Sequence, residues 1–233
     1  MATGKKDSVQ AATAVDRVVL ALRQAMFDGV LKPGTHLREK QLSEQFTVSR
    51  STVREAARVL TQDGLLRREP NRSVVVRHLT VAEVEDIFRA RRLLEGACVR
   101  NAATCPDQAL QGLAQALEVY VAAVRTDDHP RAAMAHTDFH ASMVEILSRS
   151  QWLAEVERSL LNHLVLILAA FHTKSDELAY EIEMHKELVD LCMARKVDEA
   201  LACLERGLEV FGAIAIHYTL EAYAIARAPG TGA

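Results

Sequence analysis

Two histidines, His136 and His140, stand four positions apart in a stretch with helical periodicity. Positions i and i+4 share one face of a helix, so both imidazoles can reach a single ion. A divalent ion such as Zn or Ni suits imidazole ligands. A chain with nine histidines also produces such a pair by chance. Two alternatives therefore stay open: a metal site, or a metal-free pocket lined by these histidines.

A second group of residues has side chains suited to DNA. Arg50, Ser51, Thr52 and Arg54 remain on the outer face of a predicted helix once the apolar residues around them are assigned to a core. Arg can bind the O6 and N7 atoms of guanine, and the amide groups at a helix N-terminus can bind phosphate. The alternative is an ordinary helical hairpin with a solvated polar face. The order of the neighbouring elements favours DNA binding.

The elements that must position these residues form two groups along the chain. Apolar periodicity predicts a leading helix, two short helices over about 39–46 and 49–63, and a β-hairpin with strands over 66–69 and 74–77. From Thr80, which forms a capping-box pattern with Glu83, the sequence predicts six helices with short connections. We therefore predict a mostly α protein, with an N-terminal winged helix-turn-helix that includes a small β-hairpin and a C-terminal all-α antiparallel helical bundle.

The charge distribution follows the same division. Residues 1–78 contain 14 Lys and Arg against 8 Asp and Glu, a formal charge of +6, whereas the rest of the chain carries −9. A basic first part suggests a module that faces phosphates. The expected domain limits are a disordered N-terminus over 1–13, a DNA-binding domain over 14–78, an all-helical domain over 79–228 and a disordered tail over 229–233.

Targeting signals and cysteine usage indicate the compartment. The N-terminus lacks the apolar segment of a secretory signal, and the longest apolar run, Leu164 to Phe171, is too short to span a bilayer. The four cysteines are scattered without a Cys-x-x-Cys pair, which favours reduced thiols. We expect a cytoplasmic protein without a membrane partner.

Residues 14–78 carry a set of motifs at fixed spacing: Gly29-x-Leu31-x-Pro33-Gly34-x-x-Leu37, Val48-Ser49-Arg50-x-x-Val53-Arg54-Glu55-Ala56 and Gly64-Leu65. This stretch resembles the DNA-binding domain of the GntR family of bacterial regulators. Resemblance to the FadR-type branch implies DNA contacts by Lys40, Ser49, Arg50, Ser51, Thr52 and Arg54, and by the wing-tip residues Asn71, Arg72 and Ser73. Thr47 and Ser73 stand where the family usually has glycine, which has more freedom at left-handed backbone positions.

The second part of the chain is similar to the all-helical FCD effector domain of FadR-type regulators. The similarity is carried by Arg91-Arg92-Leu93-Leu94-Glu95, Phe139-His140 and His185-Lys186-Glu187-Leu188, and six helices place the domain near the VanR-like subgroup. Family members often hold a divalent metal with Asp-x-x-x-His and two later histidines. Here the matching positions are His136, His140, His185 and Gly207, with Cys203 one turn before the glycine. Three imidazoles are sufficient for Zn or Ni, with water or an effector carboxylate completing the coordination.

The resemblance also implies residues that bind an effector. The arginine matching Arg91 can face the cavity and bind a carboxylate, for which a bidentate contact is well suited. The alternative is an intrahelical ion pair with Glu95, one turn later. His163 lies in an apolar helix, and we expect it to line the same cavity as the other histidines.

These features together predict a DNA-binding transcription regulator, most simply a homodimeric repressor on an inverted repeat. Its affinity for operator DNA would change when a small carboxylic acid binds the helical domain, with a divalent metal as a candidate cofactor. One alternative is an enzyme that activates water on a three-histidine metal site, although no accompanying general base is recognisable. Another is a constitutive architectural DNA-binding protein.

Overall fold

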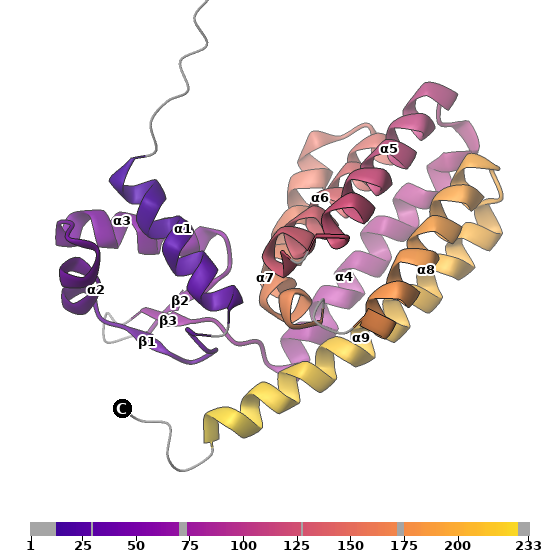
Figure 1. The fold of residues 1–233 in the computed structure, drawn as a ribbon. Coiled ribbons are helices and arrows are strands. Elements are labelled where there is room, and N and C mark those ends of the chain that lie inside the picture. Colours follow the sequence, from indigo (N-terminus) through magenta and orange to yellow (C-terminus); the bar gives the residue numbers. More distant parts are fainter. Residues whose placement is uncertain (1–12, 29, 70–73, 127, 172–174, 228–233) are drawn as a thin grey trace, which may run out of the picture.

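The computed structural model describes residues 13–28, 30–69, 74–126, 128–171 and 175–227. These residues form two units that lie side by side (Figure 1). The N-terminal unit comprises three helices and a small sheet, and the helical bundle comprises the six α-helices that follow. The fold class predicted from the sequence is confirmed. The wing tip and the two predicted disordered ends, apart from Thr13, lie outside the described residues.

The N-terminal unit follows the predicted order with one addition. Its elements are α1 (Ala14–Phe27), β1 (His36–Leu37), α2 (Glu39–Phe46), α3 (Arg50–Gln62), β2 (Leu66–Arg68) and β3 (Val74–Val76). β2 and β3 form the expected antiparallel hairpin, with Leu66 opposite Val76. The sequence analysis does not anticipate β1, which pairs with the other side of β3. A strand of two residues is too short to show the alternation by which strands are recognised.

Thr13, placed by the sequence analysis in the N-terminal segment before the DNA-binding domain, caps α1. Its side chain accepts a hydrogen bond from the backbone N–H of Asp16, and the Asp16 carboxylate accepts one from the backbone N–H of Thr13. This capping box satisfies two amide groups at the start of α1 that would otherwise lack partners. Thr13 is therefore the N-cap of α1.

Two residues with a left-handed backbone conformation flank α3, the predicted recognition helix. Gly64, at φ +75°, follows the end of α3 as the sequence predicts. Thr47, at φ 52°, forms the turn between α2 and α3. A β-branched residue is rarely found in this region of backbone space, so the missing glycine leaves local strain at the turn.

The bundle consists of α4 (Val81–Arg100), a short 3₁₀ helix (Asn101–Thr104), α5 (Asp107–Val124), α6 (His129–Ser148), α7 (Gln151–Phe171), α8 (Ser175–Met193) and α9 (Val197–Arg227). The predicted capping box of Thr80 and Glu83 begins α4. A continuous apolar core connects all six α-helices. Among the described residues, no helix combines the length and the apolar character needed to cross a membrane.

The two units share part of one core. Ala133 on α6 and Val165 on α7 pack into the apolar cluster of the N-terminal unit, which also contains Val18, Leu22 and Leu66. α9 extends from the bundle beneath the N-terminal unit (Figure 1). Helices of the bundle therefore contact the unit that carries the recognition helix.

Candidate metal site and DNA interface

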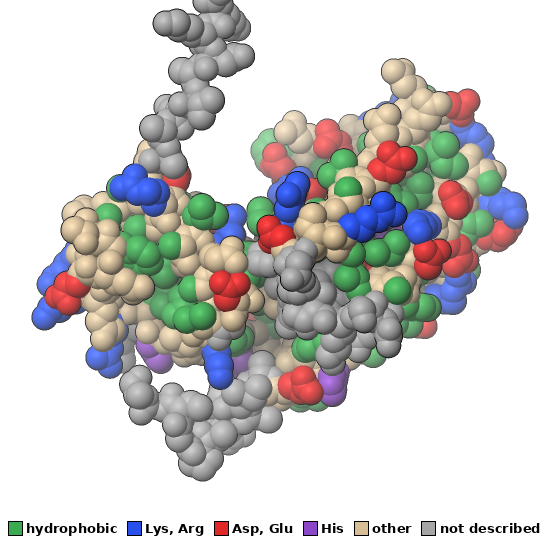
Figure 2. Space-filling view, viewed as in Figure 1, with side chains coloured by type: hydrophobic (Ala, Val, Ile, Leu, Met, Phe, Trp, Pro, Cys, Tyr) green, Lys and Arg blue, Asp and Glu red, His purple; other side chains and the backbone are tan. Residues whose placement is uncertain are grey.

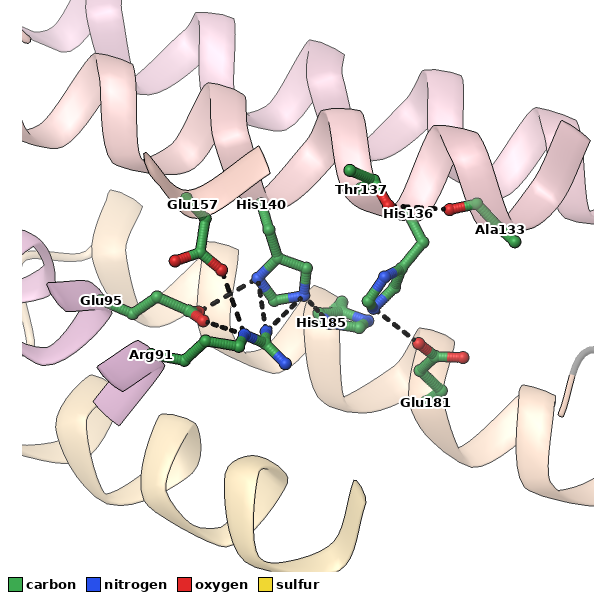
Figure 3. A network of polar contacts seen from close by, with 9 residues as sticks. All are labelled: Arg91, Glu95, Ala133, His136, Thr137, His140, Glu157, Glu181 and His185. Carbon is green, nitrogen blue, oxygen red and sulfur yellow. Dashed lines mark hydrogen bonds and ion pairs between the residues drawn. The ribbon is translucent and has the colours of Figure 1, made fainter. Parts of the chain in front are cut away.

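The structure brings the three predicted histidines together inside the bundle. His136 and His140 lie one turn apart on α6, His185 lies on α8, and at most 3% of each residue's surface is exposed. One nitrogen from each of the three rings can be chosen so that the atoms lie within 4.8 Å of one another. The Nε2 atoms of His140 and His185 are 3.1 Å apart (Figure 3). Imidazole nitrogens from two helices thus lie close enough together to bind one ion.

Two buried carboxylates determine which nitrogen carries the proton in two of these imidazole rings. Glu95 on α4 lies 3.0 Å from Nδ1 of His140, and Glu181 on α8 lies 2.8 Å from Nε2 of His136. A neutral imidazole donates its N–H to such a carboxylate, which leaves a lone pair on its other nitrogen. The same arrangement orients histidine ligands and increases their basicity in many metal sites.

Burial keeps the imidazoles in the state that binds metal. Burial, together with the charge of Arg91, lowers the pKa of His140 well below its usual value. Burial and the neighbouring His140 do the same to the pKa of His185. Both rings are therefore neutral at pH 7. Among the described residues, Nδ1 of His185 is buried without a hydrogen-bond partner, and this donor set fits a divalent ion.

Arg91 forms the pair with Glu95 and also lines the cavity. The predicted pair with Glu95 forms, at 2.8 Å, but it is buried rather than exposed. A second carboxylate, that of Glu157 on α7, accepts from the same Nε atom at 3.0 Å, and Nη2 lies 3.3 Å from Nδ1 of His140. Burial and the charge of Glu95 raise the pKa of Glu157 to about 8. The guanidinium lines the cavity, yet two carboxyl groups already bind it.

The position matching the fourth family ligand is filled by a different side chain. A Cβ atom at Gly207 would lie 2.5 Å from Sδ and Cε of Met184, so the Met184 thioether occupies that space. Cys203 lines the same cavity, but its thiol donates to the carbonyl of Met184. Burial raises the pKa of Cys203 to about 11, so it is a neutral thiol and a poor ligand. The cavity that remains, here called the histidine cavity, has a volume of about 40 Å³.

The structure contradicts the predicted placement of His163. Its imidazole does not line the histidine cavity but a second cavity between the N-terminal unit and the bundle. His163 and Glu157 are six residues apart on α7, which places their side chains on different faces of the helix. Nδ1 of His163 lies 3.3 Å from Nη1 of Arg77. Apolar periodicity identified a buried helix but not which of its faces meets which neighbour.

The described residues among those predicted to contact DNA lie on α2, on α3 and at the cap of α3. Ser49 caps α3 by accepting from the backbone N–H of Thr52, and its hydroxyl lies 2.7 Å from that of Ser51. Arg50 and Arg54 are exposed on the first turns of the same helix. Arg54 donates to Glu39 on α2 at 2.8 Å. Lys and Arg side chains line this outer edge (Figure 2), with Lys40 exposed on α2.

Three further residues of the predicted interface belong to the wing tip. Asn71, Arg72 and Ser73, predicted to contact DNA from the wing tip, lie outside the described residues. The strands that lead to them are present, and Arg67 and Arg68 on β2 are exposed. The wing contacts remain a prediction.

Comparison with known proteins decides the family. Residues 14–76 match "Bacterial regulatory proteins, gntR family", and residues 86–209, more than half of the chain, match the FCD domain. The chain belongs to the GntR family. It is a DNA-binding transcription regulator with an FCD domain. The residue pattern that suggested this resemblance is thereby confirmed, whereas the VanR-like subgroup remains a prediction.

Relatives support the same assignment. A putative GntR regulator from Rhodococcus sp. RHA1 is 30% identical, with a TM-score of 0.68 over 87% of this chain and 97% of that one. An uncharacterized HTH-type regulator from Agrobacterium vitis is 34% identical over 59% of this chain and 83% of its own length. The gluconate operon transcriptional repressor of Bacillus subtilis is 29% identical over 58% of this chain. The chain spans 55% of that repressor's length.

Two acidic residues of the site escape the sequence analysis. Glu157 and Glu181 each interrupt an apolar helix face, and both are at most 1% exposed. Glu181 stands four residues before His185, a spacing that would have placed the two on one face. A glutamate in such a position is a signal for a buried polar cluster, because an isolated buried charge is costly.

Proposed function

We propose that this regulator binds an operator with the N-terminal end of α3 and acts as a repressor. The exposed N-terminus of α3, with Arg50, Ser51 and Arg54 beside the basic edge, carries this proposal. A recognition helix enters the major groove by that end. Selection of bound fragments from genomic DNA, followed by footprinting, tests it. Protection of no defined sequence would favour the architectural alternative. Because operator DNA lies in the bacterial cytoplasm, we expect the protein to act there.

We further propose that the helical bundle holds a divalent ion, Zn or Ni, between His136, His140 and His185. The ion would supply a positive charge and fix the distance between α6 and α8. The test is elemental analysis after purification without chelator, followed by melting with and without added Zn or Ni. His140→Ala and His185→Ala should abolish retention of the metal. His217→Ala, at an exposed site paired with Glu221, should leave retention unchanged.

The absence of stoichiometric metal, combined with a melting temperature that Zn and Ni do not raise, would contradict the metal proposal. The histidines would then line a metal-free polar cluster. An enzyme on this site is disfavoured by the regulators among its relatives. The enzyme alternative would be supported if the metal-loaded protein converted a candidate acid and His140→Ala did not.

The effector is proposed to be a small carboxylic acid. The FCD domain type and a relative named for a gluconate operon agree with an acidic ligand. Arg91 is the expected partner for its carboxylate, but a ligand would have to displace Glu95 or Glu157. Breaking a buried pair of this kind costs several kcal/mol. Arg91 therefore pairs with Glu95 and Glu157 in the absence of effector. It would bind the effector only if the binding free energy exceeds the cost of breaking one of these pairs.

Dimerisation is proposed through an apolar face of α7. Trp152 and Val156, one turn apart, are 80% and 50% exposed, and Leu153 beside them is 38% exposed. A large apolar surface of this kind commonly marks an interface. A two-fold dimer would present two recognition helices to an inverted repeat.

A further inference from the structure

The histidine cavity is too small for an organic effector. Its volume of about 40 Å³ compares with about 150 Å³ for an engineered cavity that binds benzene. An ion and a water fill such a space. The guanidinium of Arg91, which lines it, is already bound by Glu95 and Glu157. The room that an organic carboxylate needs must lie elsewhere.

A larger cavity, here called the junction cavity, lies between the two units of the protein. Its volume is about 340 Å³. The N-terminal unit contributes Phe27 and Gly64, the connecting segment contributes Arg77, and the bundle contributes Leu166 and Ile167. Space of this size accommodates a small organic molecule. A ligand there would touch both units at once.

The walls of the junction cavity suit an anion with an apolar body. Arg77 uses Nη1 for His163, at 3.3 Å, and Nη2 for Glu83, at 3.2 Å. Among the described residues, one carboxyl group contacts Arg77, against two for Arg91. Burial and the charge of Arg77 lower the pKa of His163, which keeps this imidazole neutral at pH 7. Glu221, the acidic group on the wall, is paired with His217.

The junction cavity also lies where a ligand can act on the recognition helix. Gly64 follows the cap of α3, and a methyl group at this position would overlap the imidazole of His163. Ile167, on the same helix as His163, lines both the junction cavity and the histidine cavity. α7 thus separates the two cavities and contacts the end of α3.

We propose that the junction cavity, rather than the histidine cavity, binds the organic effector, a small carboxylate with an aromatic or branched apolar body. Arg77 binds the carboxylate, and Phe27 and Ile167 enclose the body. The inference rests on the proposed function, because it locates the effector of that regulator. A ligand held between α7 and the end of α3 changes how the N-terminal unit is oriented on the bundle.

The first test uses 4-iodobenzoate as the probe. Crystals of the full chain are soaked with it, and the anomalous scattering of iodine locates the bound molecule. We expect iodine in the junction cavity and the carboxylate beside Arg77. Iodine in the histidine cavity, or in neither cavity, would overturn the proposal.

The second test measures affinity for 4-iodobenzoate in solution by calorimetry. Arg77→Gln removes the charge and Leu166→Trp fills the junction cavity, so each should weaken binding at least tenfold. Ile214→Trp is the matched control, since Ile214 is also half-buried but lines the histidine cavity and not the junction cavity. The proposal fails if Ile214→Trp alone weakens binding, or if binding occurs at crystal concentration only.

Operator binding by the ligand-free protein distinguishes failure of the effector site from failure of the proposed function. If the wild type binds a defined operator and 4-iodobenzoate does not enter the junction cavity, only the present inference fails. If the wild type recognises no operator, the proposed function itself fails, whatever the probe does.

Discussion

Each carboxylate in the buried cluster fixes a proton on the imidazole that it contacts. Glu181 accepts a hydrogen bond from the N–H of His136, and Glu95 accepts one from the N–H of His140. Each imidazole therefore presents a lone pair on its other nitrogen. Glu181 is therefore a positioning residue for the proposed metal. Loss of such a partner typically lowers metal affinity by roughly 10–100-fold.

The first prediction follows from this arrangement. Glu181→Ala should weaken Zn or Ni affinity by roughly 10–100-fold while leaving one ion per chain at saturation. His140→Ala should abolish the site. Competition against a chromophoric chelator measures both affinities. Glu183→Ala, on the same helix but exposed and paired with Lys186, is the control. Equal affinity of Glu181→Ala and the wild type would show that Glu181 does not orient His136.

Glu157 gives a second prediction, on pH. Its pKa is about 8 in the folded protein and close to 4.3 in an unfolded chain. Between these values the folded state holds more protons than the unfolded state. The contribution of Glu157 to the free energy of unfolding therefore falls as pH rises from about 4.3 to about 8. Glu157→Gln does not titrate, so its stability relative to the wild type should increase with pH over that range.

Urea unfolding of the chelator-treated proteins between pH 5 and 8 measures this difference, on the order of a few kcal/mol across the range. The titrations of His140 and His185 are present in both proteins and largely cancel in the comparison. Glu205→Gln, which alters a half-exposed pair with Arg92, should show no such trend. A constant difference between Glu157→Gln and the wild type would mean that Glu157 is ionised when buried.

At the scale of elements, the recognition helix presents residues with different surroundings. Arg54 is held by Glu39, whereas Arg58, one turn later, is paired with Glu55 within the helix. The third prediction is that Arg50→Ala or Arg54→Ala reduces operator affinity by about 1–3 kcal/mol per lost base contact. Arg58→Ala, farther from the N-terminal end of α3, should retain most of the affinity. Electrophoretic mobility shifts at fixed salt, with circular dichroism as a check on folding, provide the comparison.

The turn between α2 and α3 supports a fourth prediction. Thr47 is a β-branched residue at φ 52°, where a Cβ atom costs roughly 1–2 kcal/mol. Thr47→Gly should raise the free energy of unfolding by about 0.5–1 kcal/mol, because the relief of strain exceeds the added chain entropy. Thr47→Ala keeps the Cβ atom and should not stabilise to the same extent. Urea denaturation distinguishes the two, and a destabilised Thr47→Gly would show that the Thr47 side chain makes a favourable contact.

The elements were predictable from the sequence to the extent that local signals specify them. The capping box at Thr80 and the left-handed glycine at Gly64 are encoded within a few residues. β1 has only two residues and depends on pairing with β3. The placement of His163 depends on how two units pack. Both are tertiary effects, which a local pattern does not contain.

The same limit explains which parts of the site were found. His136 and His140 were recognisable because they share a helix turn, and His185 because it matches a family motif. Glu157 joins them only because α7 packs against α4 and α6. The thioether of Met184 beside Gly207 likewise follows from packing between α8 and α9. The histidines were therefore predictable, whereas the neighbours that set their chemistry were not.

At the scale of the whole molecule, α7 carries residues for several proposed tasks. Glu157 belongs to the histidine cluster, His163 contacts the end of the recognition segment, and Trp152 and Val156 lie on the exposed face proposed for dimerisation. A rigid helix that joins these sites would couple them with an energy on the order of 1–3 kcal/mol.

The last prediction concerns the dimer. Trp152 is the chain's one tryptophan, so its emission reports on the proposed interface without labelling. Val156→Asp places a charge on that face, where pairing of two copies would bury it next to its own symmetry mate. We expect monomers in sedimentation velocity, a red shift of the Trp152 emission, and a loss of operator affinity of at least 10²-fold, since linked half-sites gain roughly 10²–10⁴ in avidity. Val119→Asp, at an exposed apolar residue on α5, should stay dimeric. Val156→Asp dimers that bind the operator as the wild type does would place the interface on another helix.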